Sequence, residues 1–199
     1  MGFTREELES FRDATVPDLV GDDVRLLLVG INPGLWTAAT ATHFAHPGNR
    51  FYPALHLGGV TPADVDPDRL RTDGHDPATR AALTGRGIAI TNVVARATAR
   101  ASELSRDELR AGGERVAAKV AARRPRLVAY VGITAYRDAY GRRSAQVGRQ
   151  PQDEWVAGVE TWAVPNPSGL NAHETVGSLA RAYREVAGAA GVDLDPPRW

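Results

Sequence analysis

Two loops in this sequence carry the residues best suited to chemistry, and each follows a short apolar run. The first loop begins after residues 26–30 and contains Asn32, His43 and Phe44 among several glycines and prolines. The second loop lies in VPNPSGLN at residues 164–171. A loop held between a buried strand and a helix can present side chains and backbone N–H groups at fixed positions. We therefore predict that the two loops face each other across one site.

Asn32 and Phe44 together indicate a pocket for a flat, polar ligand. Taken alone, an amide in a tight loop is commonly an Asx turn, and a single phenylalanine is commonly a core residue. In one loop with two prolines and two glycines, however, they build a rigid polar pocket with one flat apolar wall. A nucleobase fits such a pocket.

Other chemistries match the sequence less well. The run from Gly30 to Gly34 follows an apolar stretch, but it is not G-x-G-x-x-G and Pro33 removes one backbone N–H group, which disfavours a dinucleotide site. His43 and His46 have the spacing of metal ligands without an obvious third ligand, so we expect hydrogen-bonding roles and no metal. Ser168 lacks the G-x-S-x-G context of a hydrolase nucleophile and fits a phosphate contact or a helix cap better.

The composition narrows the classes of function. The chain has 199 residues, 43% of them hydrophobic, enough for one domain over residues 1–199. Its 24 basic and 24 acidic residues cancel, so no bulk positive charge argues for nucleic acid, although local basic patches are compatible with neutrality. The absence of cysteine excludes disulfides, thiolate metal sites and cysteine-ligated clusters. With no signal peptide and no run of 18 apolar residues, we expect a cytoplasmic protein without membrane contact.

Apolar runs and capping signals alternate in a βαβ pattern. We predict strands at residues 24–29, 88–94, 127–132 and 160–164. Helices are predicted at 134–140 and 174–187, from near Pro47, after the Thr61-Pro62 pair, and from the capping box at Ser105 to before Pro125. Residues 66–86 are expected to form loops and short helices, residues 1–20 an N-terminal helix or extension, and residues 191–199 an irregular tail.

This alternation predicts an α/β fold with three αβα layers around a central, mainly parallel sheet of four to five strands. In such sheets ligands bind at the carboxyl ends of the strands, which both loops follow.

A resemblance to a known family supports and extends this interpretation. The segments GINPGL, HFAHPGNRFY and NPSGLN, with TNVVARATARASELSRDELRAGG between the last two, resemble the mismatch-specific uracil/thymine DNA glycosylase branch of the uracil-DNA glycosylase superfamily. The similarity covers roughly Val24 to Val186. The lack of cysteine fits this branch and disfavours the superfamily members with an iron–sulfur cluster.

The resemblance implies a role for each matching residue. Asn32 corresponds to an asparagine that orients the attacking water, and Phe44 to the aromatic that stacks on the flipped base. Leu170 corresponds to the apolar plug that enters the duplex. The resemblance assigns the base pocket to Gly30, Ile31, Gly34, Thr37, His43, Phe44 and Asn92. It assigns the DNA-binding and wedge loop to Asn166, Ser168, Gly169, Leu170 and Asn171.

Several positions depart from the bacterial relatives. Thr37 stands where they have serine and vertebrate members have alanine, and Asn92 stands where they have lysine and the vertebrate members asparagine. His43 and Gly48 follow the vertebrate pattern. Ala172 replaces an arginine that contacts the opposite strand, which leaves open how the guanine opposite the lesion is recognised.

The resemblance implies a monofunctional DNA glycosylase in base excision repair. Such an enzyme flips uracil out of duplex DNA, with G·U mismatches preferred and ethenocytosine or deaminated purines as extra substrates, and hydrolyses the N-glycosidic bond. No cofactor is expected, and we expect a monomer that associates with the nucleoid when bound to DNA. Two alternatives are a non-catalytic protein that binds lesions or abasic sites and, with less support, a nucleoside hydrolase.

Overall fold

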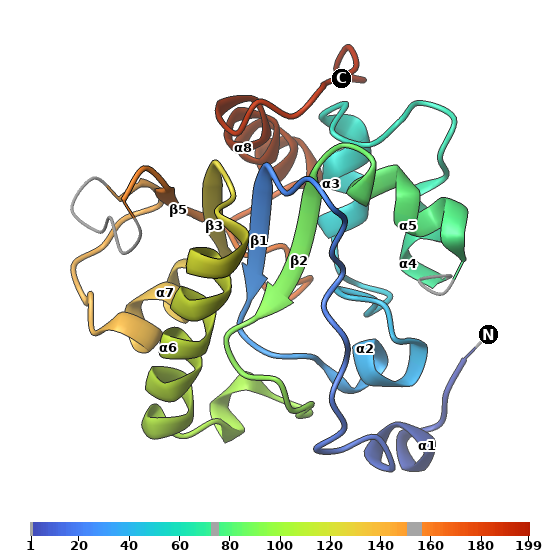
Figure 1. Ribbon diagram of the computed structural model, residues 1–199. Coiled ribbons are helices and arrows are strands. Elements are labelled where there is room, and N and C mark those ends of the chain that lie inside the picture. The colour runs from blue at the N-terminus through green and yellow to red at the C-terminus, as the bar shows by residue number, and fades with distance from the viewer. Residues whose placement is uncertain (1, 73–75, 151–156) are drawn as a thin grey trace.

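The computed structural model describes residues 2–72, 76–150 and 157–199, and its centre is one twisted sheet (Figure 1). The strands run in the order β2-β1-β3-β5-β4. The first four are mutually parallel, and the short edge strand β4 is antiparallel to β5. The bounds are β1 (Leu26–Gly30), β2 (Ile88–Asn92), β3 (Leu127–Val131), β4 (Gly148–Arg149) and β5 (Glu160–Val164). The four predicted strands and the mainly parallel sheet are confirmed.

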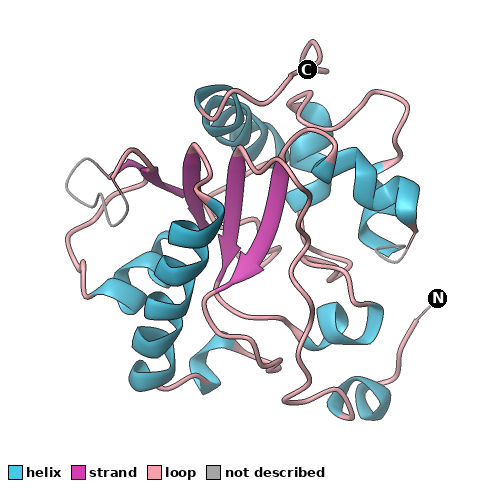
Figure 2. Cartoon of the chain, in the orientation of Figure 1, coloured by secondary structure: helices cyan, strands magenta, loops and turns pink. Residues whose placement is uncertain are grey.

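Helices cover both faces of this sheet (Figure 2), which confirms the predicted three layers. Those within the described ranges are α1 (Arg5–Glu9), α2 (Leu35–Thr40), α3 (Phe51–Leu57), α4 (Pro67–Thr72), α5 (Pro77–Thr84), α6 (Arg106–Arg123), α7 (Ile133–Tyr140) and α8 (Val176–Ala189), with a 3-10 turn at Ala101–Glu103. None of these helices is both long enough and apolar enough to cross a bilayer.

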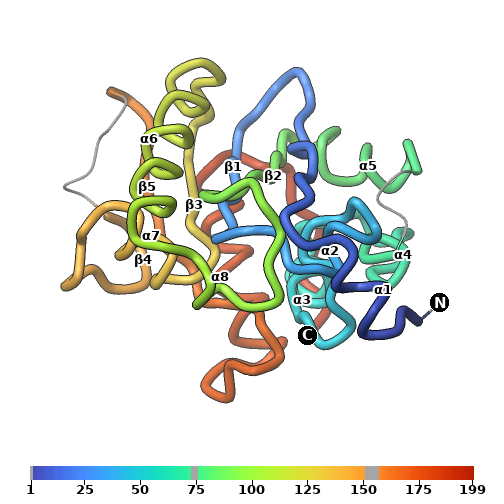
Figure 3. Tube along the Cα trace, turned by 90° about the horizontal axis from the view of Figure 1, so that it is seen from below, coloured from blue at the N-terminus to red at the C-terminus, as the bar shows by residue number. Residues whose placement is uncertain are grey.

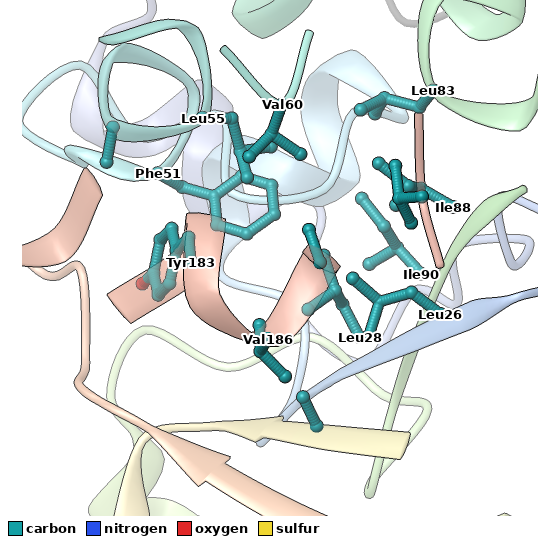
Figure 4. Packing of buried hydrophobic residues seen from close by; sticks show 14 of the residues in the cluster. Leu26, Leu28, Phe51, Leu55, Val60, Leu83, Ile88, Ile90, Tyr183 and Val186 are labelled. Carbon is teal, nitrogen blue, oxygen red and sulfur yellow. The ribbon is translucent and has the colours of Figure 1, made fainter. Parts of the chain in front are cut away.

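The alternation of side chains along β1 divides the core into two parts. Leu26 and Leu28 pack on the side of α3 and α8, where Phe51 and Tyr183 are fully buried (Figure 4). Leu27 and Val29 face the opposite side, toward the helices α6 and α7. Because β1 is covered on both faces, it carries no polar side chain. The sheet is thereby a rigid base for the loops at its carboxyl edge.

Capping signals located several helix starts correctly. Ser105 caps α6 and exchanges hydrogen bonds with Glu108 in the predicted capping box. Thr4 and Glu7 form the same motif at α1. The stretch after residue 66 contains two short helices, as expected, and residues 73–75 of its expected loops lie outside the described residues.

Two local predictions were wrong, and one short helix was not predicted. The helix predicted from near Pro47 begins at Phe51, because the Asn49 side chain accepts from the Phe51 N–H and ends the preceding turn. Thr61-Pro62 forms a turn instead of a helix start, with the Val65 N–H bonded to the Pro62 carbonyl. The first loop also contains α2, a short helix that was not predicted; Gly34 precedes it without a side-chain cap.

The C-terminal segment after α8 is irregular yet tightly held. Asp195 accepts hydrogen bonds from Arg86 at 2.7 Å and from Arg198 at 2.9 Å. The Asp195 N–H bonds the Gly59 carbonyl at 2.9 Å, and the Arg198 N–H bonds the Leu57 carbonyl at 2.7 Å. The segment is therefore fastened to the end of α3, whose other end carries the first loop.

We expect Asp195→Asn to lower the melting temperature by about 2–4 °C, because losing a charge-assisted pair costs about 1 kcal/mol. The Arg86 hydrogen bond holds the pKa of Asp195 below its ordinary value of 3.8. The stabilisation is thus complete above pH 3.8 and is lost as the pH falls through the lower folded-state pKa, so the two proteins converge in acid. The exposed Asp193→Asn is the matched control; an equal shift in both variants would contradict the assignment.

Candidate functional site

The carboxyl ends of the four parallel strands border one cleft of about 940 Å³. Its lining includes Asn32 after β1, Asn92 at the end of β2, Val131 at the end of β3 and Asn166 after β5. In Figure 1 these loops gather below the arrowheads of the sheet. The volume is in the range of small-molecule and cofactor sites. The predicted site residues that line the cleft are Ile31, Asn32, Gly34, Thr37, His43, Phe44, Asn92, Asn166 and Ser168.

The orientation of the Asn32 amide is fixed by acceptors on one side. Its Nδ2 lies 3.0 Å from the Pro33 carbonyl, 3.2 Å from the Arg96 carbonyl and 2.8 Å from the Thr98 hydroxyl. Carbonyl oxygens only accept, so the atom facing them must be the nitrogen. Within the described chain no group donates to Oδ1, and that oxygen is left to accept a hydrogen bond from a molecule in the cleft.

An ionic network holds the segment that supplies two of these acceptors. The Arg96 guanidinium binds both carboxylate oxygens of Glu108 and also Asp13, at 2.9 Å from Asp13 Oδ1. The Arg96 hydrogen bond, with the Ser105 cap, lowers the pKa of Glu108 to about 2. The carboxylate is therefore ionised at neutral pH, and the pair ties the segment after β2 to the start of α6.

Phe44 forms one wall of the cleft in a strained backbone conformation. Its φ of 59° is in the left-handed region, which costs energy for a residue with a side chain. One ring face stacks on Phe51, with centroids 4.0 Å apart and an interplanar angle of 26°. The buried Tyr52 hydroxyl donates to the His43 carbonyl at 2.8 Å, just before this strained position. The ring is thus supported on one side and borders the cleft on the other.

Several backbone donors at the cleft have no partner among the residues that the structure describes. The N–H groups of Ile31, Gly34 and Phe44 donate to no residue in the described ranges. Thr37 lies on α2, is only 5% exposed, and also lines the cleft. A ligand with carbonyl oxygens on its edge would satisfy such donors.

His43 and His46 do not form a metal pair. Both ring nitrogens of His43 have protein partners, Pro17 and Asn92. His46 is exposed at the rim, where its ring lies 6.2 Å from that of Trp36 and its Nδ1 accepts from Gly48. In the part of the chain that the structure describes, no three His, Asp or Glu side chains are grouped as metal ligands.

The second loop stands at the edge of the cleft and exposes Leu170, which is 96% exposed. It follows β5 and projects from the body of the molecule in Figure 3. Asn166 Oδ1 accepts from the Ser168 N–H at 2.9 Å, and Asn171 Nδ2 donates to the Asn166 carbonyl at 3.0 Å. Gly169 packs so closely that a Cβ there would lie 2.5 Å from the Gly48 carbonyl oxygen. Gly169, Leu170 and Asn171 belong to this loop without lining the cleft.

Arg50 joins the two loops. Its guanidinium donates to the carbonyls of Ser168, Asn171 and Glu174, and its own N–H bonds the Pro167 carbonyl at 3.0 Å. A planar guanidinium can hold several carbonyls in a fixed arrangement, which an ammonium group does less well. Arg50 was not among the predicted site residues, although it belongs to the HFAHPGNRFY segment.

The N-terminal helix also contributes to the cleft, which the sequence did not indicate. Arg5 and Arg12 of this region line it, together with Trp36 of α2. The Phe3 ring packs edge-on against the Trp36 ring, with centroids 5.2 Å apart. Arg12 forms an ion pair with Glu103, which lies in the 3-10 turn after β2. These contacts join residues far apart in the chain, so local patterns give no sign of them.

A protein-family model matches the part of the chain that forms this cleft. The family model described as the uracil DNA glycosylase superfamily matches residues 17–187. The matched range contains all four parallel strands and both loops that border the cleft. Because this range is far more than half of its length, the chain belongs to the uracil DNA glycosylase superfamily.

Proposed function

We propose that this protein is a monofunctional glycosylase of the mismatch-specific type, which removes uracil opposite guanine from duplex DNA. Membership of the superfamily supports a hydrolase that acts on N-glycosyl bonds in DNA. The observation that carries the finer proposal is the Asn32 amide, whose nitrogen is held by three acceptors while its oxygen is open to the cleft. We propose that the protein acts as a monomer.

In the proposed reaction, water attacks C1′ of the deoxyribose as the bond from C1′ to N1 of uracil breaks. The bonding electrons leave with uracil as a resonance-stabilised anion, and the water proton passes to solvent, leaving a hydroxyl on C1′. Asn32 Oδ1 accepts a hydrogen bond from the water and aligns it below the sugar. An amide is not a base, so its contribution is positioning.

The uracil ring is proposed to lie on the free face of Phe44. The N–H groups of Ile31, Gly34 and Phe44, which donate to no other described residue, supply donors for its carbonyl oxygens, where negative charge grows as the base leaves. Thr37, if directed at C5 of the base, excludes the methyl group of thymine more strongly than serine or alanine would. Thymine is therefore proposed as a poor substrate, and ethenocytosine and deaminated purines as secondary ones.

The second loop is proposed to keep the duplex open. Leu170 is a large apolar side chain exposed to solvent, where its hydration is unfavourable. Its loop is held in place by hydrogen bonds from Arg50. Apolar side chains of this kind insert between base steps in other DNA-binding proteins. Asn166 and Ser168 are the residues of this loop that line the cleft, where they would hold the flipped nucleotide and its phosphates.

The proposal predicts activity on one class of substrate in a simple panel. Labelled duplexes with uracil, thymine, ethenocytosine, hypoxanthine or xanthine opposite each base are incubated with the protein and then cleaved with alkali at abasic sites. We expect the fastest release from uracil opposite guanine and slow release from thymine. Binding without strand cleavage would favour a non-catalytic lesion-binding protein, and release from free uridine in preference to DNA would favour a nucleoside hydrolase.

The wedge role predicts a loss that depends on pair stability. Leu170→Ala should reduce uracil release from U·A pairs by roughly tenfold more than from U·G wobble pairs, because the weaker pair opens more readily. Arg50→Met should give the same bias, since the loop loses the donor to its carbonyls. Single-stranded uracil DNA is the internal control, and Val147→Ala, at an exposed apolar residue outside both loops, is the matched control variant. Equal losses on all three substrates would contradict a wedge.

A further inference from the structure

His43 is a buried ring with a fixed tautomer. Its Nε2 lies 3.1 Å from the Pro17 carbonyl, and the residue is 5% exposed. A carbonyl oxygen only accepts, so Nε2 carries a proton. Burial lowers the pKa of His43, which keeps the ring neutral at neutral pH and leaves Nδ1 without a proton.

The tautomer of His43 fixes the amide of Asn92. Asn92 Nδ2 lies 3.3 Å from His43 Nδ1, and a bare Nδ1 can only accept, so the Asn92 nitrogen must be the atom that faces it. The amide oxygen then points the other way. A Cβ placed on Gly30 would lie 2.5 Å from Asn92 Oδ1 and 3.4 Å from Phe44 Cζ. The oxygen therefore stands over Gly30, beside the edge of the Phe44 ring.

The charged groups around His43 keep this arrangement in place. Asp18, next to Pro17, favours a protonated ring, but its carboxylate is bound by Lys119 of α6 at 2.7 Å and by the Thr91 hydroxyl at 2.7 Å. Lys119 and Arg80 of α5 both disfavour a positive charge on His43. The segment of residues 17–19 is itself fixed to β2, because Leu19 and Ile90 exchange backbone hydrogen bonds at 3.0 and 2.8 Å.

We propose that His43, held by the Pro17 carbonyl, is a positioning residue that sets the Asn92 amide as a hydrogen-bond acceptor and so makes the pocket prefer a base with an N–H group on that edge. Uracil offers such a donor at N3, whereas 3,N4-ethenocytosine has none there. This inference rests on the proposed function, since it assumes that the base lies on Phe44. Base choice would then depend on residues before β1 that do not touch the base.

The test compares uracil with ethenocytosine, each opposite guanine, in single-turnover reactions at saturating enzyme. His43→Leu removes both hydrogen bonds and lets the Asn92 amide turn, so the ratio of the uracil rate to the ethenocytosine rate should fall by about tenfold. His43→Asn can place an amide oxygen near the position of Nδ1, and it should keep the ratio within about threefold of the wild-type value. A ring needed only for packing would give equal losses on both substrates and no rescue by asparagine.

Two further variants make the result independent of how His43→Leu folds. Gly30→Ala leaves His43 in place but displaces Asn92 Oδ1, and it should lower the same ratio. In an Asn92→Leu background, His43→Leu should have no additional effect on the ratio, because the two residues act through one amide. An unchanged ratio in both His43→Leu and Gly30→Ala would overturn this inference alone. Failure of the wild-type protein to release either base would overturn the proposed function, and this inference with it.

Discussion

The site depends on a single constraint, the three acceptors that surround Nδ2 of Asn32. An isolated asparagine side chain can turn its amide over at little cost, and then oxygen and nitrogen exchange places. Here the carbonyls of Pro33 and Arg96 and the Thr98 hydroxyl allow one orientation only. Two of the three acceptors come from the segment after β2, so the pairing of β1 with β2 is what brings the amide and its partners together.

The same strand pair determines the other side of the pocket. Gly30 and Asn92 are partners in the β1–β2 register, and the lack of a side chain on Gly30 leaves room for the Asn92 amide and the Phe44 ring. The stack of Phe44 on Phe51 joins that pocket wall to the core between α3 and α8. Core packing and the geometry of the cleft are therefore parts of one structure, and the strained backbone of Phe44 is held by the packing beneath it.

The sequence predicted what local patterns encode. Apolar runs and capping boxes located the four parallel strands and the start of α6, because a strand buried on both faces and a capped helix each leave a local signature. The edge strand β4 is only two residues long, and α2 is a short helix without a side-chain cap, so neither had such a signature. Contacts between distant segments, such as Arg50 with the second loop or Pro17 with His43, have no local pattern at all.

The resemblance located candidate residues but not the groups that orient them. It singled out Asn32, Asn92 and Leu170, whereas the acceptors around Asn32, the ring that holds Asn92 and the guanidinium that fastens the loop of Leu170 became visible only in three dimensions. The orientation of each site side chain is set by hydrogen bonds between segments that are distant in the sequence. For this reason a sequence predicts which residues form a site more readily than how their polar atoms are directed.

The most direct test of the account is the single-turnover rate of uracil release by Asn32→Ala, measured beside its affinity for the same U·G duplex. We expect the rate to fall by roughly 100-fold, in the range for the loss of one positioned polar group, while the affinity is unchanged. The rate of uracil release by Thr98→Val should lie between the rates of this variant and the wild type. The rate of Thr98→Ser, which keeps the hydroxyl, should match that of the wild type. A rate for Asn32→Ala within about twofold of the wild-type value would contradict the role of the amide.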